Sequence, residues 1–311
     1  MPKKIKFIYF GSSFFSREIL SKLLKEGLLP NCVVSKPDMP AGRGLKLIPT
    51  QVSRLAQEKK IPLIKPESLK APLLEEKLVE VKPDFFIIAD YGKIIPGHLL
   101  KIPELFPVCV HPSLLPLYRG ATPIETFLVD GGAETGVTIF AVNESVDAGD
   151  IFRQKKISVD TRDNFFGLRD KLIEAGAELL IEVLKSIKEK KYSLVAQDES
   201  RATVTIKLVK KMGRINWQDD AVRIYNQTRA FAEWPGSFTY FGKTRVVVVL
   251  AEVVSGSGCP GEIISLDKKG IVVSAGKGAV LLERIKPEGK NDMDAWAFAC
   301  GHGVELGGKF T

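Results

Sequence analysis

Short apolar runs alternate with amphipathic stretches through the first part of the chain. Unbroken apolar runs of strand length are typical of strands buried on both faces, and the stretches between them have helical spacing. The expected strands are residues 4–10, 31–34, 61–64, 85–89, 106–111, 136–142 and 151–159, and the expected helices are residues 17–25, 50–60, 73–81 and 168–188. This alternation predicts an N-terminal α/β domain with a doubly wound, Rossmann-like, mostly parallel sheet.

The pattern changes after the last of these helices. Residues 192–212 are polar, lysine-rich and weakly patterned, which is typical of a linker. One helix at 219–230 then precedes strand segments separated by glycines, at 236–240, 244–253, 261–267, 270–275 and 279–285. We therefore expect three parts: an α/β domain at 1–191, a basic linker at 192–212, and a small C-terminal β-barrel, OB-like, at 213–311.

The composition is that of an ordinary globular protein, with 311 residues of which 45% are hydrophobic and 26% charged. We expect a cytoplasmic protein that does not enter a membrane, because no apolar run approaches the roughly 20 residues of a membrane helix and the basic, apolar start reads as a first strand. The four cysteines show no metal-ligand spacing, so we expect reduced thiols. The net charge of +8 favours a polyanionic partner, although a solvated lysine-rich surface would carry the same charge.

Two motifs place polar side chains where ligands bind in open parallel sheets, at the carboxyl ends of strands. His111 ends the strand predicted at 106–111, where an imidazole could exchange protons or donate to developing negative charge. Asp147 and Asp150 follow the strand predicted at 136–142, and a carboxylate beside an imidazole can hold its tautomer. A structural histidine and an aspartate-capped turn are the alternative interpretations, and the residues alone do not decide between them.

A third segment, SKPDMPAGRGLKL at 35–47, combines glycines and prolines with Lys36, Arg43 and Lys46. Glycines let a partner approach the backbone closely, and the cations can contact phosphates. The segment is not a G-x-x-x-x-G-K-[ST] loop, and Gly11, after the first expected strand, is isolated and does not begin a G-x-G-x-x-G fingerprint. A mobile surface loop is the alternative.

These motifs, in this order, resemble the 10-formyltetrahydrofolate-dependent formyltransferases, and within that family the members that act on initiator tRNA. The segments that carry the resemblance are HPSLLPLYRGATPI (111–124), AETGVTIF (133–140), VDAGD (146–150), PDMPAGRGLKL (37–47), DYGKIIP (90–96) and, beyond the linker, GRINW (213–217), TRAFAEWPGSFT (228–239) and residues 261–293. The resemblance implies transfer of a formyl group from 10-formyltetrahydrofolate to the α-amino group of methionine on initiator tRNA, for translation initiation. It makes residues 1–191 a catalytic domain and residues 213–311 a tRNA-binding domain.

The resemblance also implies roles for particular residues. His111 would donate to the oxyanion of a tetrahedral intermediate formed by direct attack of the amine, and Asp147 would orient His111 and help to move protons. The folate would contact Ser113, Leu114, Leu115, Pro116, Asp90, Tyr91, Gly92 and Ile95, and the tRNA would contact Arg43, Lys36, Lys46, Arg201, Lys207, Lys210 and Lys211. No metal is implied, and we expect a monomer.

Cys109 departs from the family pattern, which has asparagine two residues before the histidine. Residues 109 and 111 share a face of their strand, so a thiol stands where an amide would donate to the formyl oxygen, and a thiol is the weaker donor. We favour an enzyme that is active but slow or helped by another donor. A catalytically impaired folate- or tRNA-binding homologue, a formyltransferase for a sugar-nucleotide amine, and a Cys109 nucleophile paired with His111 are the alternatives, the last being the weakest.

Overall fold

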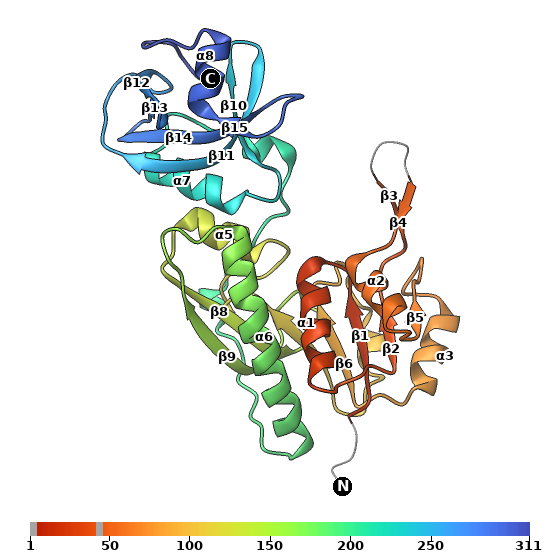
Figure 1. Cartoon of the computed structure of the whole chain (residues 1–311). Helices are drawn as coiled ribbons and strands as arrows, with labels where there is room; N and C mark the ends of the chain where they lie inside the picture. Colours follow the sequence, from red (N-terminus) through yellow and green to blue (C-terminus); the bar gives the residue numbers. More distant parts are fainter. Residues whose placement is uncertain (1–4, 42–45) are drawn as a thin grey trace. The chain divides into compact units, whose positions relative to one another are not determined.

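The computed structural model describes residues 5–41 and 46–311, which form two compact units (Figure 1). The first unit contains Met1–Pro123, Glu134–Ser158 and Arg169–Thr205, and the second contains Ile124–Ala133, Val159–Leu168 and Ile206–Thr311. The units therefore interleave along the sequence, and the three-part division expected above stays a prediction.

The first unit is built on a seven-stranded sheet. Its order is β5 (Leu63–Ile64), β2 (Cys32–Val34), β1 (Phe7–Gly11), β6 (Phe85–Ala89), β7 (Phe106–His111), β8 (Glu134–Ala141) and β9 (Ile151–Ser158). The strands from β5 to β7 pair in parallel, whereas β8 is antiparallel to both of its neighbours. The mostly parallel sheet predicted from the alternation of strands and helices is confirmed.

Helices cover both faces of this sheet. They are α1 (Phe14–Lys25), α2 (Gln51–Glu58), α3 (Pro72–Glu80), α4 (Gly97–Leu100) and α6 (Phe165–Lys188). A Cβ added to Gly176 of α6 would lie 3.1 Å from Val110, 3.4 Å from Val137 and 3.5 Å from Ile19, so α6 packs on β7, β8 and α1. Leucines of α3 and α4 belong to a different apolar cluster, which also contains Cys109. Val110 and Cys109 thus face opposite sides of the sheet, as alternation along a strand requires.

The helix starts follow ordinary capping chemistry. Thr50 precedes α2, and its side chain accepts a hydrogen bond of 3.0 Å from the backbone N–H of Ser53, as predicted for this cap. Ser13 caps α1 in the same way. The predicted loop at 35–47 instead contains a two-stranded hairpin, β3 (Met39–Ala41) and β4 (Lys46–Ile48), in which Met39 pairs with Ile48. Arg43 lies outside the described residues.

The second unit contains a six-stranded antiparallel sheet, which confirms the all-β pattern predicted for this region. Its strands are β10 (Ser237–Phe241), β11 (Thr244–Val254), β14 (Ala279–Pro287), β13 (Gly270–Ser274) and β12 (Ile263–Asp267) in that order, with β15 (Met293–Asp294) beside β14. Helices α7 (Ala221–Ala230) and α8 (Ala295–His302) share one apolar cluster with these strands through Ile224 and Phe298. An OB-like barrel stays the prediction for how the sheet closes.

Arg229 of α7 explains why earlier parts of the chain belong to this unit. Its side chain is buried and donates to the side chain of Asn226 at 3.0 Å and to the carbonyl oxygens of Asp163 at 2.9 Å and Leu128 at 3.5 Å. Leu128 lies on α5 (Pro123–Asp130), a helix that the sequence patterns did not predict. One guanidinium therefore joins three segments of the second unit.

Two further findings concern membranes and metals. Over residues 5–41 and 46–311, the structure contains no helix with the length and apolarity needed to cross a membrane. The same residues include no group of three or more histidine, cysteine, aspartate or glutamate side chains placed to hold a metal ion.

Candidate active site

His111 ends β7 and is buried, with 5% of its surface exposed. Its Nε2 lies 2.9 Å from the carbonyl oxygen of Tyr118, and because a carbonyl only accepts, Nε2 carries the proton of this hydrogen bond. Its Nδ1 lies 3.6 Å from Oδ2 of Asp147, which is too long for a hydrogen bond but close for a charge. The two side chains singled out in the sequence therefore face each other, and a backbone carbonyl that the sequence did not indicate orients the ring.

The loop after His111 is held by hydrogen bonds of its own. Ser113 is fully buried and donates from Oγ to the carbonyl oxygen of Leu117 at 2.7 Å. The hydroxyl of Thr138 on β8 donates to the carbonyl of Ser113 at 2.6 Å and accepts from the backbone N–H of Leu115 at 3.0 Å. Gln154 on β9 donates to the carbonyl of Leu115 at 2.8 Å. The hydroxyl of Ser113 is thus committed to the architecture of the loop.

Three non-glycine residues with positive φ lie at this end of the sheet: Asp90 (φ 38°), Tyr118 (φ 59°) and Asp147 (φ 51°). Other non-glycine residues of this kind in the described chain, Lys60, Lys82 and Lys190, come just after α2, α3 and α6, where left-handed residues are ordinary. A left-handed non-glycine residue is strained, and such strain persists where the surroundings over-determine the conformation, often at functional sites. The strained Tyr118 and Asp147 are also the two residues that face the imidazole.

Glycines in both motifs allow close approach of backbone. A Cβ at Gly149 would overlap the carbonyl oxygen of Ala141. Gly120 has φ 108°, and a Cβ there would lie 2.8 Å from Oγ1 of Thr205. Its backbone N–H donates to Oδ2 of Asp147 at 2.8 Å, so the loop after His111 also fixes the carboxylate that faces His111.

Cys109 lies one strand position before Val110 and faces the same side as His111. It is buried in one apolar cluster with Tyr91, Ile95 and Leu115. Burial raises the pKa of the Cys109 thiol well above its usual value, and the carboxylates of Asp147 and Asp90 raise it further. The thiol is therefore protonated at neutral pH, which counts against the alternative in which Cys109 is a nucleophile.

The eight residues predicted to contact folate fall into two groups. Around Cys109 lie Tyr91, Ile95 and Leu115 in its apolar cluster, with Asp90 and Gly92 exposed at the end of β6. Ser113, Leu114 and Pro116 instead build the loop after His111: Leu114 packs against Gly136, and the carbonyl of Pro116 accepts from the backbone N–H of Thr203 at 3.2 Å.

Tyr91 has an unusual environment within the first group. Burial raises its pKa to about 12. Its Oη is buried and, counted over the residues that the structure describes, has no hydrogen-bond partner. A buried hydroxyl without a partner is costly, and a polar group of a ligand would relieve that cost.

The cations predicted to contact tRNA are divided between the two units. Lys36 is half-buried, and its Nζ lies against Gly92, beside the predicted folate segment. Lys46 is exposed on β4 and Arg201 is exposed in the first unit. Lys207, Lys210 and Lys211 are exposed in the second unit, and Arg43 is outside the described residues.

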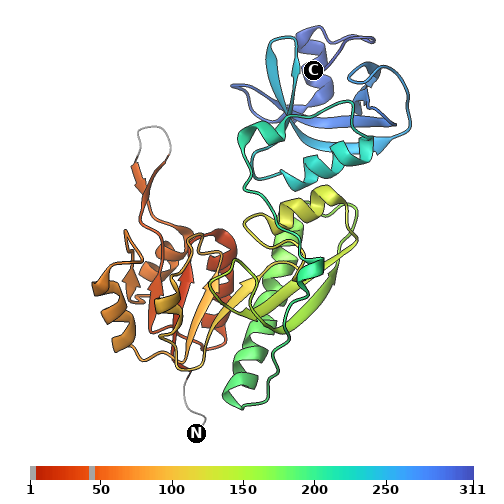
Figure 2. The same cartoon turned by 180° about the vertical axis from the view of Figure 1, so that it is seen from behind.

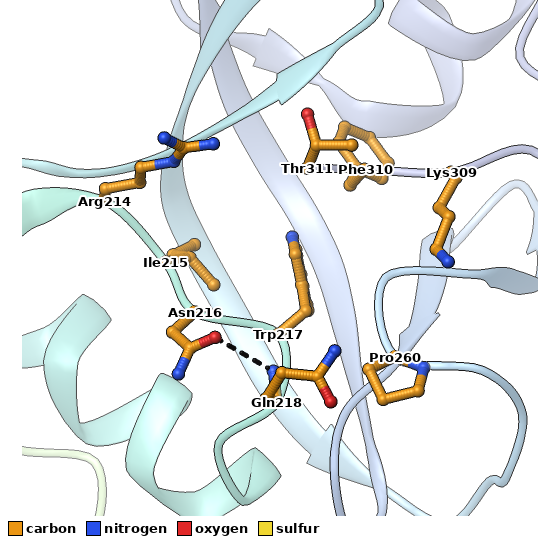
Figure 3. Close-up of a pocket in the computed structure, with 9 residues that line it drawn as sticks. All are labelled: Arg214, Ile215, Asn216, Trp217, Gln218, Pro260, Lys309, Phe310 and Thr311. Atoms are coloured by element: carbon orange, nitrogen blue, oxygen red, sulfur yellow. Dashed lines mark hydrogen bonds between the residues drawn. The ribbon is translucent and has the colours of Figure 1, made fainter.

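The second unit also contains a hollow of about 420 Å³ (Figure 3). It is lined by Arg214, Ile215, Asn216, Trp217, Gln218, Pro260, Lys309, Phe310 and Thr311. Figure 3 shows the side chains of Arg214 and Lys309 on opposite sides of the hollow, with the indole of Trp217 between them. Trp217 is a core residue, and its Nε1 donates to Oγ1 of Thr239 at 2.9 Å. The hollow thus combines two cationic side chains with an aromatic residue of the core.

Comparisons with known proteins agree with this architecture. The family described as formyl transferase matches residues 3–184, and the family described as formyl transferase, C-terminal domain, matches residues 207–303. Among solved structures, an N-formyltransferase from Helicobacter canadensis in complex with folinic acid and dTDP-3-aminofucose matches with a TM-score of 0.68. The two proteins are 19% identical, and the match covers 89% of this chain and 98% of the solved structure. At this identity the likeness concerns the fold.

Curated relatives are similar over their full length. The methionyl-tRNA formyltransferase of Kosmotoga olearia is 39% identical, over 98% of this chain and 100% of the relative. That of Thermotoga maritima is 38% identical, over 98% of each. A buried histidine and an aspartate face each other at the carboxyl end of β7, and the similarity extends through both units. The chain belongs to the formyl transferase family.

Proposed function

We propose that this protein transfers the formyl group of 10-formyltetrahydrofolate to the α-amino group of methionine on initiator tRNA, the reaction that supplies formylmethionyl-tRNA for translation initiation. The observation that carries the proposal is the similarity to methionyl-tRNA formyltransferases, which extends through both units at 38–39% identity. The histidine and aspartate that face each other in the first unit support the chemistry.

The proposed transfer is a direct attack. The neutral amine forms a bond to the formyl carbon, the bond from that carbon to N10 of the folate breaks, and one proton passes from the amine to N10. Negative charge develops on the formyl oxygen in the tetrahedral intermediate, and a positioned donor in a buried site stabilises it. We assign that role to the Nδ1 edge of His111, which would donate when it carries a proton of its own, because Nε2 already donates to the carbonyl of Tyr118.

Asp147 would accept a proton from the amine during the transfer. Its Oδ2 lies 3.6 Å from Nδ1 of His111 and accepts a hydrogen bond of 2.8 Å from the backbone N–H of Gly120. A carboxylate in this place can accept a proton from the attacking nitrogen, directly or through water. The neutral thiol of Cys109 is a weak second donor, so we propose an enzyme that is active but slower than one with asparagine at this position.

The substrates would lie on either side of this pair. We propose that Asp90, Tyr91, Gly92, Ile95 and Leu115 contact the folate, and the partnerless Oη of Tyr91 supports a polar ligand group there. The cations predicted for tRNA binding would contact phosphates and position the acceptor arm without reading bases; they are Lys36, Lys46, Arg201, Lys207, Lys210 and Lys211, together with Arg43. The reaction as proposed uses no metal, and we propose a monomer that works in the cytoplasm.

A formylation assay tests the proposal. The protein is incubated with 10-formyltetrahydrofolate and either methionine-charged initiator tRNA, the uncharged tRNA, or a dTDP-amino sugar, and formyl product is measured. We expect product with the charged tRNA alone. Product with the amino sugar would instead favour a sugar-nucleotide formyltransferase, and binding of tRNA or folate without any product would favour a catalytically impaired homologue.

A further inference from the structure

Residues 195–205, which the sequence suggests are part of a linker, lie across both loops that face His111. We call these residues the strap, and Figure 2 shows the chain after α6 running back along the first unit. Val195 pairs with Ile151 of β9 through backbone hydrogen bonds of 2.8 and 3.0 Å. Further along, the backbone N–H of Arg119 donates to the carbonyl of Thr203 at 2.9 Å, and its backbone carbonyl accepts from the N–H of Thr205 at 2.7 Å. The strap thus adds to β9 at one end and to the loop after His111 at the other.

Gln197 holds the loop that carries Asp147. Its Nε2 donates to the carbonyl oxygens of Asp147 at 2.9 Å and Gly149 at 2.8 Å. Its Oε1 accepts from Nε and Nη2 of Arg119 at 3.1 and 2.8 Å. Because the guanidinium only donates, the amide oxygen must face Arg119 and the amide nitrogen must face the two carbonyls.

Arg119 is itself fixed. Its side chain is buried and makes a two-pronged contact with the carboxylate of Glu199 in the strap, at 2.8 and 2.7 Å. Donation of hydrogen bonds to Glu199 raises the pKa of Arg119 above its already high ordinary value. A planar guanidinium held in this way has one orientation, so it determines which way the amide of Gln197 points.

The strap also holds the loop that carries Tyr118. The hydroxyl of Thr203 accepts a hydrogen bond of 2.7 Å from the backbone N–H of Tyr118. Tyr118 is left-handed, and its carbonyl oxygen is the partner of Nε2 of His111. The strap therefore contacts the backbone of both strained residues that face the imidazole.

We propose that the strap is the positioning element of the catalytic centre: Gln197, oriented by Arg119, sets the place of the Asp147 carboxylate, and Thr203 sets the place of the Tyr118 carbonyl, so that both partners of His111 depend on it. The inference rests on the proposed function for its kinetic consequence. Its structural consequence, the environment of the His111 ring, does not depend on which reaction the protein catalyses.

Gln197→Glu is the first test. The new carboxylate still accepts from Arg119 but presents an oxygen, not an N–H, to the carbonyls of Asp147 and Gly149. Because a displacement of 1 Å at a catalytic group can lower turnover about 10²-fold, we expect kcat to fall by about that factor. Gln227→Glu is the matched control, since Gln227 in the second unit also donates from Nε2 to backbone carbonyls, among them that of Gly213 at 3.2 Å. Its kcat at saturating substrates should equal that of the unmodified protein.

Thr203→Val is a second test that does not depend on the folding of the first. It removes the acceptor of the Tyr118 N–H with little change of shape, whereas Thr203→Ser keeps it. We expect Thr203→Val to lower kcat and Thr203→Ser to restore it. Equal turnover in both variants would contradict the role of Thr203.

Two readouts separate positioning from general structural support. In an Asp147→Asn background, Gln197→Glu should lower kcat no further, because it acts through Asp147; a full additional loss would overturn the proposal.

The chain has three histidines, so their ring signals can be followed by NMR. The His111 signals should shift in Gln197→Glu and Thr203→Val and stay in place in Gln227→Glu. His111 signals that stay in place in Gln197→Glu and Thr203→Val would contradict the positioning role of the strap. If the signals shift but the unmodified protein forms no formylated tRNA, only the proposed function is contradicted.

Discussion

Arg119 in the first unit and Arg229 in the second are both buried, at 7% and 8% exposure, and both join segments that are far apart in the sequence. Their partners differ. Arg119 binds two side chains of the strap, and its hydrogen bond with Glu199 raises its pKa. Arg229 binds the side chain of Asn226 and two backbone carbonyls, and burial lowers its pKa.

The difference lies in what each arginine holds. The segments joined by Arg229 carry helices and turns of the second unit, so its hydrogen bonds contribute to stability. Those around Arg119 carry the strained Tyr118 and Asp147, both of which face an imidazole. The same kind of residue thus stabilises one unit and, in the other, determines where reactive groups stand.

The largest expected effect is loss of the imidazole. His111→Ala should lower kcat by about 10²–10⁴-fold, the usual contribution of a positioned acid–base group. Asp147→Ala should also come close to abolishing transfer. His302→Ala in the second unit is the control, because His302 contacts the carbonyl of Phe298 and lies in none of the predicted sites. Steady-state formylation kinetics measure all three variants. If His111→Ala kept most of its activity, the first unit would no longer be distinguished from the second as the one that contains the reactive groups.

Next is a gain. Cys109→Asn should raise kcat, by up to the 10²–10³-fold that a lost oxyanion donor typically costs. The amide is a stronger donor than the neutral thiol and points to the same side of β7 as His111. Cys109→Ser, which has a hydroxyl but no amide, is the control. Unchanged or lower turnover in Cys109→Asn would mean that another donor already fills this place.

The two arginines can be compared directly by Arg119→Met and Arg229→Met. Arg119→Met should lower kcat by about 10²-fold, because the amide of Gln197 loses its orientation. Arg229→Met should leave kcat unchanged and lower the free energy of unfolding, by about 1–3 kcal/mol for each buried carbonyl left without a donor. Kinetics and urea unfolding of both variants decide, and the comparison fails if the two variants lose turnover equally.

The smallest effect is an alkaline loss of stability that comes from the first unit. Burial raises the pKa of Cys32 to about 11, whereas a thiol in an unfolded chain ionises near 8.5. Between these values the unfolded state loses a proton that the folded state keeps, so the free energy of unfolding falls as pH rises above about 8.5. Below 8.5 both states are protonated, and the contribution is constant.

Urea unfolding at pH 7.5 and pH 10 measures this loss, with Cys32→Ala as the comparison. The destabilisation caused by Cys32→Ala should be smaller at pH 10 than at pH 7.5. An equal destabilisation at both pH values would contradict the buried-thiol argument.

Local patterns predicted much of the fold. The strands Phe85–Ala89 and Phe106–His111 agree with the predicted ranges residue for residue. Polar residues at 84 and 90 mark both ends of the apolar run of the first strand, and the second strand ends where its apolar run reaches His111. The Thr50 cap was predicted for a similar reason, since capping depends on residues three apart. Helix α5 and the β3–β4 hairpin were missed, because both are short and the hairpin lies in a segment rich in glycine and proline.

The site divides in the same way. His111 and Asp147 could be found because each follows a recognisable strand within a motif. The Tyr118 carbonyl left no signal, since any residue carries one. Gln197 and Glu199 lie in a polar stretch that resembles a linker, and no motif in the sequence indicated their contacts with Arg119.

The sequence by itself determined most of the strands of the first sheet and the change to an antiparallel sheet, and it singled out an imidazole and a carboxylate as candidates, because these depend on periodicity and on short motifs. The tertiary structure decided which groups surround that imidazole. Arg119 meets Gln197 across 78 positions of the chain, and Tyr118 meets Thr203 across 85. Contacts of that separation follow from how the whole chain packs, and no local pattern of residues encodes them.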